Sequence, residues 1–190
     1  MARAGLTADR LTQAAAALAD EVGLDKVTVS ALARSFGVKD ASLYSHIKNL
    51  ADLRTRVAVL AAREFADRLS AAVAGRAGGD ALRAFGHAYR SFALEHPGRY
   101  EANQLRLDPA VIAGSPGHLR NIETTGAVLR GYGLTEPDLT DAVRLLRSTF
   151  HGWISVEAAN GFAHPRDVET SWERALDALD LLLSTWPSRG

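Results

Sequence analysis

Apolar positions recur along this chain every three or four residues, as is typical of helices, and no segment alternates as a β-strand would. Alanine, leucine, arginine and glutamate, which favour helices, are abundant throughout. Clusters of glycine and proline divide the pattern into segments. The helices predicted in this way lie near residues 8–22, 28–36, 40–46, 50–74, 80–96, 98–105, 116–130, 136–159 and 166–186. The fold class is therefore predicted to be all-α, with about nine helices.

The first three predicted helices are short, and local signals bound them. Thr7 is expected to cap the first helix and Gly23 to end it. Thr28 is expected to cap the second helix, and Gly37 to supply the positive φ of a tight turn before the third. Two short helices joined by a glycine-bearing turn are typical of a helix-turn-helix unit. The residues expected to point into its core are Leu11, Ala15, Leu18, Val22, Leu32, Phe36, Leu43 and Ile47.

Two capping-box patterns mark later helix starts. Asn49 and Asp52 have this spacing at the start of the long fourth helix. A second pattern begins at Thr135, with Pro137 in the first turn. The domain boundary is placed at the first of them. Residues 1–49 are expected to form a three-helix helix-turn-helix domain, and residues 50–190 a bundle of helices for effector binding and dimerisation.

The last two predicted helices carry more apolar surface than one core contact would use. The helix at 136–159 has two apolar stripes, and the helix at 166–186 adds another. Part of this surface is expected to be ordinary core, but an extra stripe near the end of the chain favours a subunit interface, so a homodimer is predicted. The residues predicted for the dimer interface are Leu139, Val143, Leu146, Trp153, Trp172, Leu176, Leu179 and Leu183.

The composition excludes several classes of protein. The formal net charge is zero, which argues against a protein coated in nucleic acid. Cysteine is absent, so a disulfide framework, a thiolate metal site and a cysteine nucleophile are excluded. No uncharged run approaches the roughly 18 residues that span a bilayer, and acidic residues bracket the alanine run at 14–17 too closely for a signal peptide. The chain is expected to be cytoplasmic, with no membrane partner.

Positive charge is nevertheless concentrated around the third predicted helix. Between residues 34 and 56, five basic side chains face two acidic ones, a local balance of +3. Such a cluster is expected of a surface that binds DNA phosphates, and it also fits an ordinary solvated helix surface. The basic residues are Arg34, Lys39, Lys48, Arg54 and Arg56.

Residues 9–56 resemble the DNA-binding domain of TetR-family transcriptional regulators. The resemblance rests on the alanine-rich first helix, the turn at Gly37 and Val38, and above all the run LYSHIKN at residues 43–49. The element HGW at residues 151–153 also resembles the His-Gly-containing C-terminal domain of some family members. The resemblance implies a homodimer that binds a partly palindromic, double-stranded DNA operator.

Carried over onto this chain, the resemblance assigns phosphate contacts to Tyr44, Lys48 and Ser30. It places the turn and the outer face of the third helix against bases or nearby backbone. Asp40 is expected to cap the third helix, and the alternative is a hydrogen bond from cytosine N4. His46 is expected to pack its ring at the interface, and no pH switch is predicted for it. The residues predicted to bind DNA are Ser30, Lys39, Asp40, Ala41, Ser42, Tyr44, Ser45, His46 and Lys48.

The resemblance further implies a small-molecule effector. Aromatic side chains at helical spacing on the middle helices would wall a mostly apolar pocket for it, which suits an apolar or amphipathic molecule. For any one of these aromatics, ordinary core packing is the alternative. The residues predicted to line the pocket are Phe85, Tyr89, Phe92, Tyr100, Gln104 and Phe150.

Two other classes of function compete with this interpretation. An enzyme is disfavoured because no two histidines stand four residues apart, no His-Glu-x-x-His string occurs and no glycine-rich phosphate loop follows a strand. No bound metal and no cofactor are predicted. A constitutive architectural DNA binder is disfavoured by the neutral net charge and the large non-basic bundle. The sequence therefore predicts a ligand-responsive transcriptional regulator, most simply a repressor.

Overall fold

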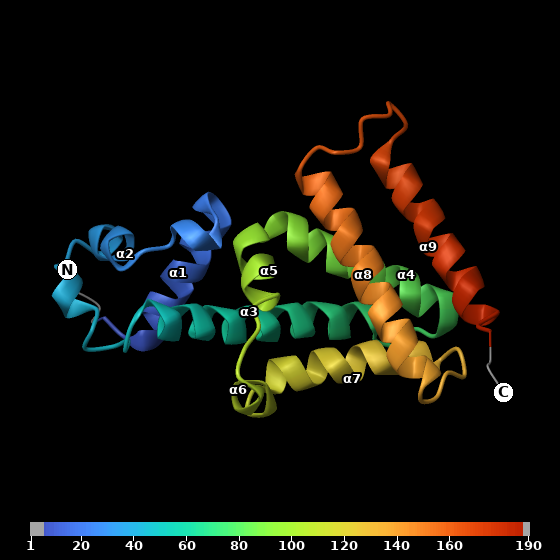
Figure 1. The fold of residues 1–190 in the computed structure, drawn as a ribbon, viewed down its shortest axis with the longest axis horizontal. Helices are drawn as coiled ribbons and strands as arrows, with labels where there is room; N and C mark the ends of the chain where they lie inside the picture. The colour runs from blue at the N-terminus through green and yellow to red at the C-terminus, as the bar shows by residue number, and fades with distance from the viewer. Residues whose placement is uncertain (1–5, 188–190) are drawn as a thin grey trace. The chain divides into compact units, whose positions relative to one another are not determined.

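The computed structural model describes residues 6–187, and these residues form helices without any strand. The α-helices of this part of the chain are α1 (Ala8–Val22), α2 (Val29–Phe36), α3 (Leu50–Val73), α4 (Gly78–Glu95), α5 (Pro97–Asn103), α6 (Pro109–Ala113), α7 (Pro116–Arg130), α8 (Asp138–Ala158) and α9 (Val168–Ser184) (Figure 1). Two 3₁₀ turns, η1 (Leu24–Lys26) and η2 (Asp40–Ser42), lie between them. The predicted all-α fold with about nine helices is confirmed.

The nine helices differ from the nine expected in two places. The short helix α6 begins where Asp108 accepts a hydrogen bond from the N–H of Ala110, and it was not predicted. The third helix expected at residues 40–46 is instead η2 followed by hydrogen-bonded turns. The Ser45 hydroxyl donates to the carbonyl of Ser42, the acceptor that the His46 N–H would use in an α-helix, and that N–H bonds to Leu43 instead.

The chain folds as two compact units. Unit 1 comprises the chain up to Glu64 together with Glu95–His118, and unit 2 comprises Phe65–Leu94 and the chain from Leu119 onward. The units therefore divide within α3, whereas the boundary expected from the sequence at residues 49 and 50 lies at its N-terminus. That boundary stays a prediction.

The core of unit 1 brings together α1, α2, the segment after η2 and the first half of α3. Leu11, Ala15 and Leu43 are buried there as expected. Val22 is not, because it is the last residue of α1 and is 40% exposed, while Ala19 continues the buried stripe. The buried residues of this core are Leu11, Ala15, Ala16, Ala19, Leu24, Val27, Leu32, Ala33, Leu43, Ile47, Leu53, Val57, Ala58, Leu60, Ala61 and Ala102.

Helix α5 is packed tightly against α1 inside unit 1 (Figure 1). A Cβ atom added at Gly98 would lie 2.1 Å from the carbonyl carbon of Ala19, so only glycine allows this approach. The Arg99 guanidinium pairs with Asp20 at 2.6 Å, and Glu101 accepts a hydrogen bond from the N–H of Leu24 at 3.2 Å. Helix α5, which follows the first unit 2 segment along the chain, is thus part of unit 1 together with the N-terminal helices.

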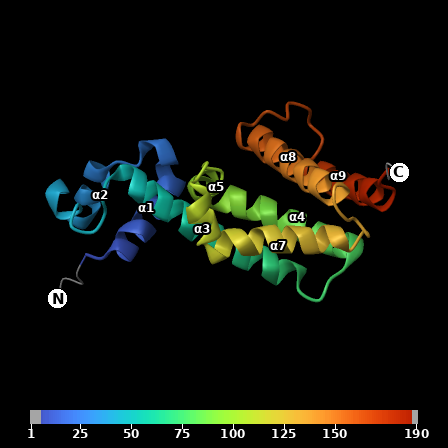
Figure 2. The same ribbon diagram turned by 60° about the horizontal axis from the view of Figure 1, so that its bottom comes forward.

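Unit 2 contains α4, α7, α8, α9 and the second half of α3. Helices α8 and α9 lie side by side (Figures 1 and 2), and the ring of Phe150 on α8 is 5.3 Å from that of Trp172 on α9. Helix α7 is joined to α3 by a hydrogen bond between the hydroxyls of Ser70 and Thr124. None of the described helices has both the length and the apolar character needed to cross a membrane.

The capping box predicted at Thr135 does not form. Pro137 is the N-cap residue of α8, and no side chain caps the helix there. Nearby, the Thr140 hydroxyl donates to the carboxylate of Glu136.

Candidate nucleic-acid interface

The turn after α2 fixes the start of the candidate interface. Thr28 caps α2 by accepting a hydrogen bond from the N–H of Ala31 at 3.1 Å. Gly37 ends the helix with a φ of +65°, the left-handed conformation that glycine adopts without strain. The N–H of Val38 then bonds back to the carbonyl of Ala33 at 3.0 Å, which completes a Schellman motif.

The segment that follows is a tight series of turns held by two buried side chains. The N–H groups of Ser42 and Leu43 bond to the carbonyls of Lys39 and Asp40 at 2.9 and 3.0 Å. Leu43 and Ile47 are buried in the core of unit 1. These two anchors leave the intervening residues on the outside.

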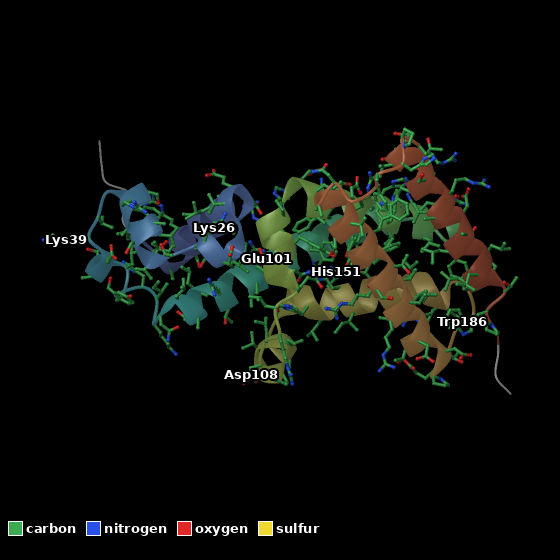
Figure 3. The ribbon with its side chains drawn as sticks, turned by 45° about the horizontal axis from the view of Figure 1, so that its top comes forward. Lys26, Lys39, Glu101, Asp108, His151 and Trp186 are labelled. Atoms are coloured by element: carbon green, nitrogen blue, oxygen red, sulfur yellow. The ribbon has the colours of Figure 1, made fainter. Side chains whose placement is uncertain are left out.

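The predicted DNA-contacting residues form this outer surface. Tyr44 is 54% exposed although it is a large aromatic residue, and Lys39 points away from the ribbon (Figure 3). His46 is half-buried, with its backbone N–H bonded to the carbonyl of Leu43. The predicted residues that are exposed are Ser30, Lys39, Asp40, Ala41, Ser42, Tyr44, Ser45 and Lys48.

Internal hydrogen bonds limit what two serines can do. The Ser45 hydroxyl donates to the carbonyl of Ser42 at 2.8 Å, and the Ser30 hydroxyl donates to the carboxylate of Asp40. A hydroxyl has only one hydrogen, so while these bonds persist both serines can act only as acceptors. Asp40 does not cap η2 as expected. The N-cap residue of η2 is Lys39, and no side chain makes a capping hydrogen bond there. The carboxylate of Asp40 is held by α2 instead.

The basic cluster predicted from the sequence separates into two groups. Arg54 donates to the carbonyl of Asp25 at 3.1 Å, and Arg56 pairs with Asp52 at 3.1 Å. Within residues 6–187, Arg34, Lys39 and Lys48 form no ion pair. These three cations are therefore available to an anionic partner, and Arg34 adds to the set predicted to contact DNA.

The N-terminus of α3 adjoins this surface. Asn49 accepts a hydrogen bond from the N–H of Asp52 at 2.8 Å, so this half of the predicted capping box is confirmed. Asp52 accepts its return bond from the N–H of Lys48 at 3.0 Å and not from that of Asn49. Burial raises the pKa of Asp52, but the bonds from Lys48 and Arg56 outweigh it, and the pKa lies below its ordinary value.

The residues predicted for an effector pocket are divided between the two units. In unit 2, the rings of Phe85 and Phe150 both lie near Tyr89, at 6.1 and 5.3 Å, and Phe92 joins them through Phe65. Tyr100 and Gln104, at the end of α5, belong to unit 1. The pocket stays a prediction.

The residues predicted for a dimer interface also separate into two groups. The side chains packed inside unit 2 itself are Leu146, Trp172, Leu176, Leu179 and Leu183. Leu139, Val143 and Trp153 are half-buried. The apolar surface that α8 and α9 leave exposed lies elsewhere, at Val156, Leu181 and Leu182. Gly152, four residues before Val156 on α8, is also exposed, and a Cβ atom added there would meet open space.

Comparison with known proteins places this geometry among bacterial regulators. Residues 11–57 match the family described as bacterial regulatory proteins, tetR family, and residues 82–179 match the tetracyclin repressor-like C-terminal domain. Over 166 residues the chain is 32% identical to the uncharacterized HTH-type transcriptional regulator YobS of Bacillus subtilis, an alignment that covers 87% of this chain and 86% of YobS.

Solved structures with similar folds extend over nearly the whole chain. A protein of unknown function from Rhodococcus sp. RHA1 has a TM-score of 0.77 at 20% identity, covering 95% of this chain and 97% of its own. The TetR family protein ActR of Streptomyces coelicolor, solved in complex with actinorhodin, has a TM-score of 0.66 at 20% identity, with the same two coverages. At such identities these likenesses establish the fold alone.

Proposed function

We propose that this chain, which belongs to the TetR family of bacterial transcriptional regulators, is a repressor that binds a partly palindromic operator as a homodimer and is released by a small apolar or amphipathic effector. Family membership makes it a DNA-binding regulator of transcription and not an enzyme. A regulator of this kind acts in the cytoplasm, where it meets DNA. The observation that supports DNA binding most directly is the exposed segment 39–48, whose Lys39 and Lys48 form no ion pair within residues 6–187.

The roles proposed within this segment follow from the available hydrogen-bond donors. Lys48 and the exposed hydroxyl of Tyr44 donate to phosphates, and Arg34 adds positive charge. Ser45 can only accept, so it reads the amino group of adenine or cytosine. Ser42 contacts a base or the nearby backbone.

The experiment that tests DNA binding is selection of bound fragments from random double-stranded DNA. We expect a recurring inverted repeat, with half-site centres about one helical turn apart or slightly more. Fragments without an inverted repeat would contradict a dimeric, sequence-specific repressor and favour an architectural protein. Uniform binding with a steep salt dependence would lead to the same conclusion.

The homodimer is proposed to form through the exposed apolar surface of α8 and α9. Val156, Leu181 and Leu182 are large apolar side chains that the chain leaves 40%, 68% and 42% exposed, and exposed apolar side chains of this size favour a partner. Gly152 would let two helix backbones approach closely. The interface is thus proposed on the same two helices that the sequence predicts, but with different residues in contact.

The effector is proposed to bind against the aromatic side chains of unit 2. The ActR structure contains actinorhodin, which offers a precedent for a ligand in this fold. The effector must bind the DNA-incompetent arrangement more tightly, and a coupling of about 1–3 kcal/mol is usual. Helix α3 passes from unit 1 into unit 2, and the chain returns to α1 through α5, so both connections can transmit a shift.

A screen of hydrophobic small molecules for operator release tests the switch. Phe92→Trp, which adds volume to the aromatic cluster, is expected to weaken effector binding. Its control is Ile122→Trp, which adds an indole ring at an exposed position of α7 in unit 2, outside the aromatic cluster. A molecule that binds tightly without changing operator affinity would contradict the switch.

A further inference from the structure

The contact between α4 and α9 in unit 2 is a row of charged side chains with one unusual position. On α4, Arg83 pairs with Asp177 at 3.1 Å and Arg90 pairs with Glu169 at 2.5 Å. Between these arginines stands His87, whose Nε2 lies 3.0 Å from a carboxylate oxygen of Glu173 on α9. At this position an imidazole replaces the guanidinium of its neighbours.

The charges around His87 do not balance. Arg90 faces both Glu169 and the largely buried Glu157, which it contacts at 2.7 Å. Glu173 contacts His87 and not Arg90, so this part of the contact holds three carboxylates and one guanidinium, and two negative charges are left over. Among residues 6–187 no lysine or arginine pairs with Glu173. A divalent cation carries the two positive charges that would neutralise these carboxylates.

The donor atoms are arranged as such a cation requires. One ligand atom each from His87, Glu169 and Glu173 lie within 4.8 Å of one another. In a tetrahedral zinc site with bonds of about 2.0–2.2 Å, the ligand atoms are about 3.3–3.6 Å apart, so only small rotamer changes of these solvent-accessible side chains are needed. Glu169 and Glu173 are four residues apart on one helix and therefore share a face toward α4.

We propose that His87, Glu169 and Glu173 bind a transition-metal dication of the Zn²⁺ class, with water completing the coordination. An imidazole nitrogen among the ligands favours Zn²⁺ over Mg²⁺ and Ca²⁺, which prefer oxygen ligands alone. Arg90 occupies one oxygen of Glu169 and leaves the other for the metal. The bound ion links α4 to α9. No single helix carries the full ligand set, because His87 lies on α4 and both glutamates lie on α9, which is why a search for in-helix histidine spacing predicts no metal.

Titration of the full-length, tag-free protein with Zn²⁺ tests the site by calorimetry and thermal unfolding. The wild type is expected to bind one Zn²⁺ per chain and to unfold at a higher temperature when loaded. His87→Gln and Glu173→Gln are each expected to lose affinity at least tenfold and to lose the thermal shift. His164→Gln removes an exposed histidine outside the cluster and is the matched control, with affinity unchanged.

Cobalt provides a second readout, because a bound Co²⁺ gives visible absorption bands that should vanish in His87→Gln. Circular dichroism separates loss of the site from loss of the fold. Equal Zn²⁺ affinity in the wild type and His87→Gln would overturn the proposal, as would the absence of saturable binding. Displacement of Zn²⁺ by millimolar Mg²⁺ would also overturn it. The pair His87–Glu173 would then be a surface hydrogen bond only.

Discussion

At the scale of single residues, the hydrogen bond between Ser30 and Asp40 determines how the interface meets DNA. It places a carboxylate among the cations of segment 39–48 and occupies the hydrogen of the Ser30 hydroxyl. Asp40→Ala is expected to raise affinity for every duplex about threefold or more, because it removes repulsion from phosphates and frees Ser30 to donate. Fluorescence anisotropy with operator and scrambled duplexes measures the change.

The control for net charge is Asp141→Ala, which removes an exposed carboxylate on α8 in unit 2. It should leave DNA affinity unchanged. If Asp40→Ala instead lost affinity for one base pair of the operator only, Asp40 would be reading cytosine, the alternative that the sequence leaves open.

Ser45 and Lys48 are expected to respond differently to truncation. Ser45→Ala should lower preference for one base pair by about 1 kcal/mol or more, since it loses an acceptor facing a base amino group. Lys48→Ala should weaken binding to all sequences and reduce the slope of log affinity against log salt by about 1. Binding to a set of singly mutated operators at three salt concentrations distinguishes the two. A uniform loss for Ser45→Ala would place that residue on the DNA backbone.

At the scale of helices and turns, the structure separates what local sequence signals determine from what they do not. Thr7, Thr28 and Asn49 cap the helices they were expected to cap, because a cap depends on residues three positions away. The third helix could not be predicted in the same way. Whether the Ser45 hydroxyl or the His46 N–H bonds the Ser42 carbonyl is a close competition that helical period does not reveal.

The capping interactions at the start of α3 give stability a defined pH dependence. Asp52→Asn is expected to cost about 1 kcal/mol at pH 7, at the low end for a bond to a charged group because the carboxylate is partly solvated. The folded pKa of Asp52 is lowered, so its contribution is present above the unfolded pKa and is lost as pH falls through the folded value. Urea unfolding at pH 7 and near pH 3 should therefore show a difference in stability between the wild type and Asp52→Asn that is smaller in acid. The stability change caused by Asp52→Asn is compared with that caused by Asp67→Asn, which lies on the unit 2 part of α3.

At the scale of the whole molecule, burial decides which apolar stripes are available to a partner. A stripe read from sequence does not show whether another segment of the chain already covers it. The structure buries Leu146 and Leu179, so glutamate at either position would place a charge in the core and unfold unit 2 instead of separating subunits.

Val156→Glu and Leu182→Glu are expected to convert the dimer to a folded monomer. Both side chains are exposed within the chain, so the cost falls on association. Sedimentation equilibrium at micromolar concentration, with circular dichroism as a check of folding, measures the outcome. Ile122→Glu on α7 changes an even more exposed side chain and should remain dimeric. A dimer retained in both α8 and α9 variants would move the interface away from these helices.

The packing of α5 on α1 has a consequence for how relatives of this protein can diverge. The match to the N-terminal family ends at residue 57, but Arg99 and Glu101 lie beyond it and bond to residues within it: Arg99 donates to Asp20, and Glu101 accepts from the N–H of Leu24. Recombination that exchanged only the first 57 residues would lose the Arg99–Asp20 pair wherever the new segment lacks an acidic residue at position 20, and it would pack Ala102 against different core side chains. New operator specificity is therefore expected to arise by point substitution in segment 39–48. Where the DNA-binding part is inherited as a block, that block must carry the residues of α5 with it.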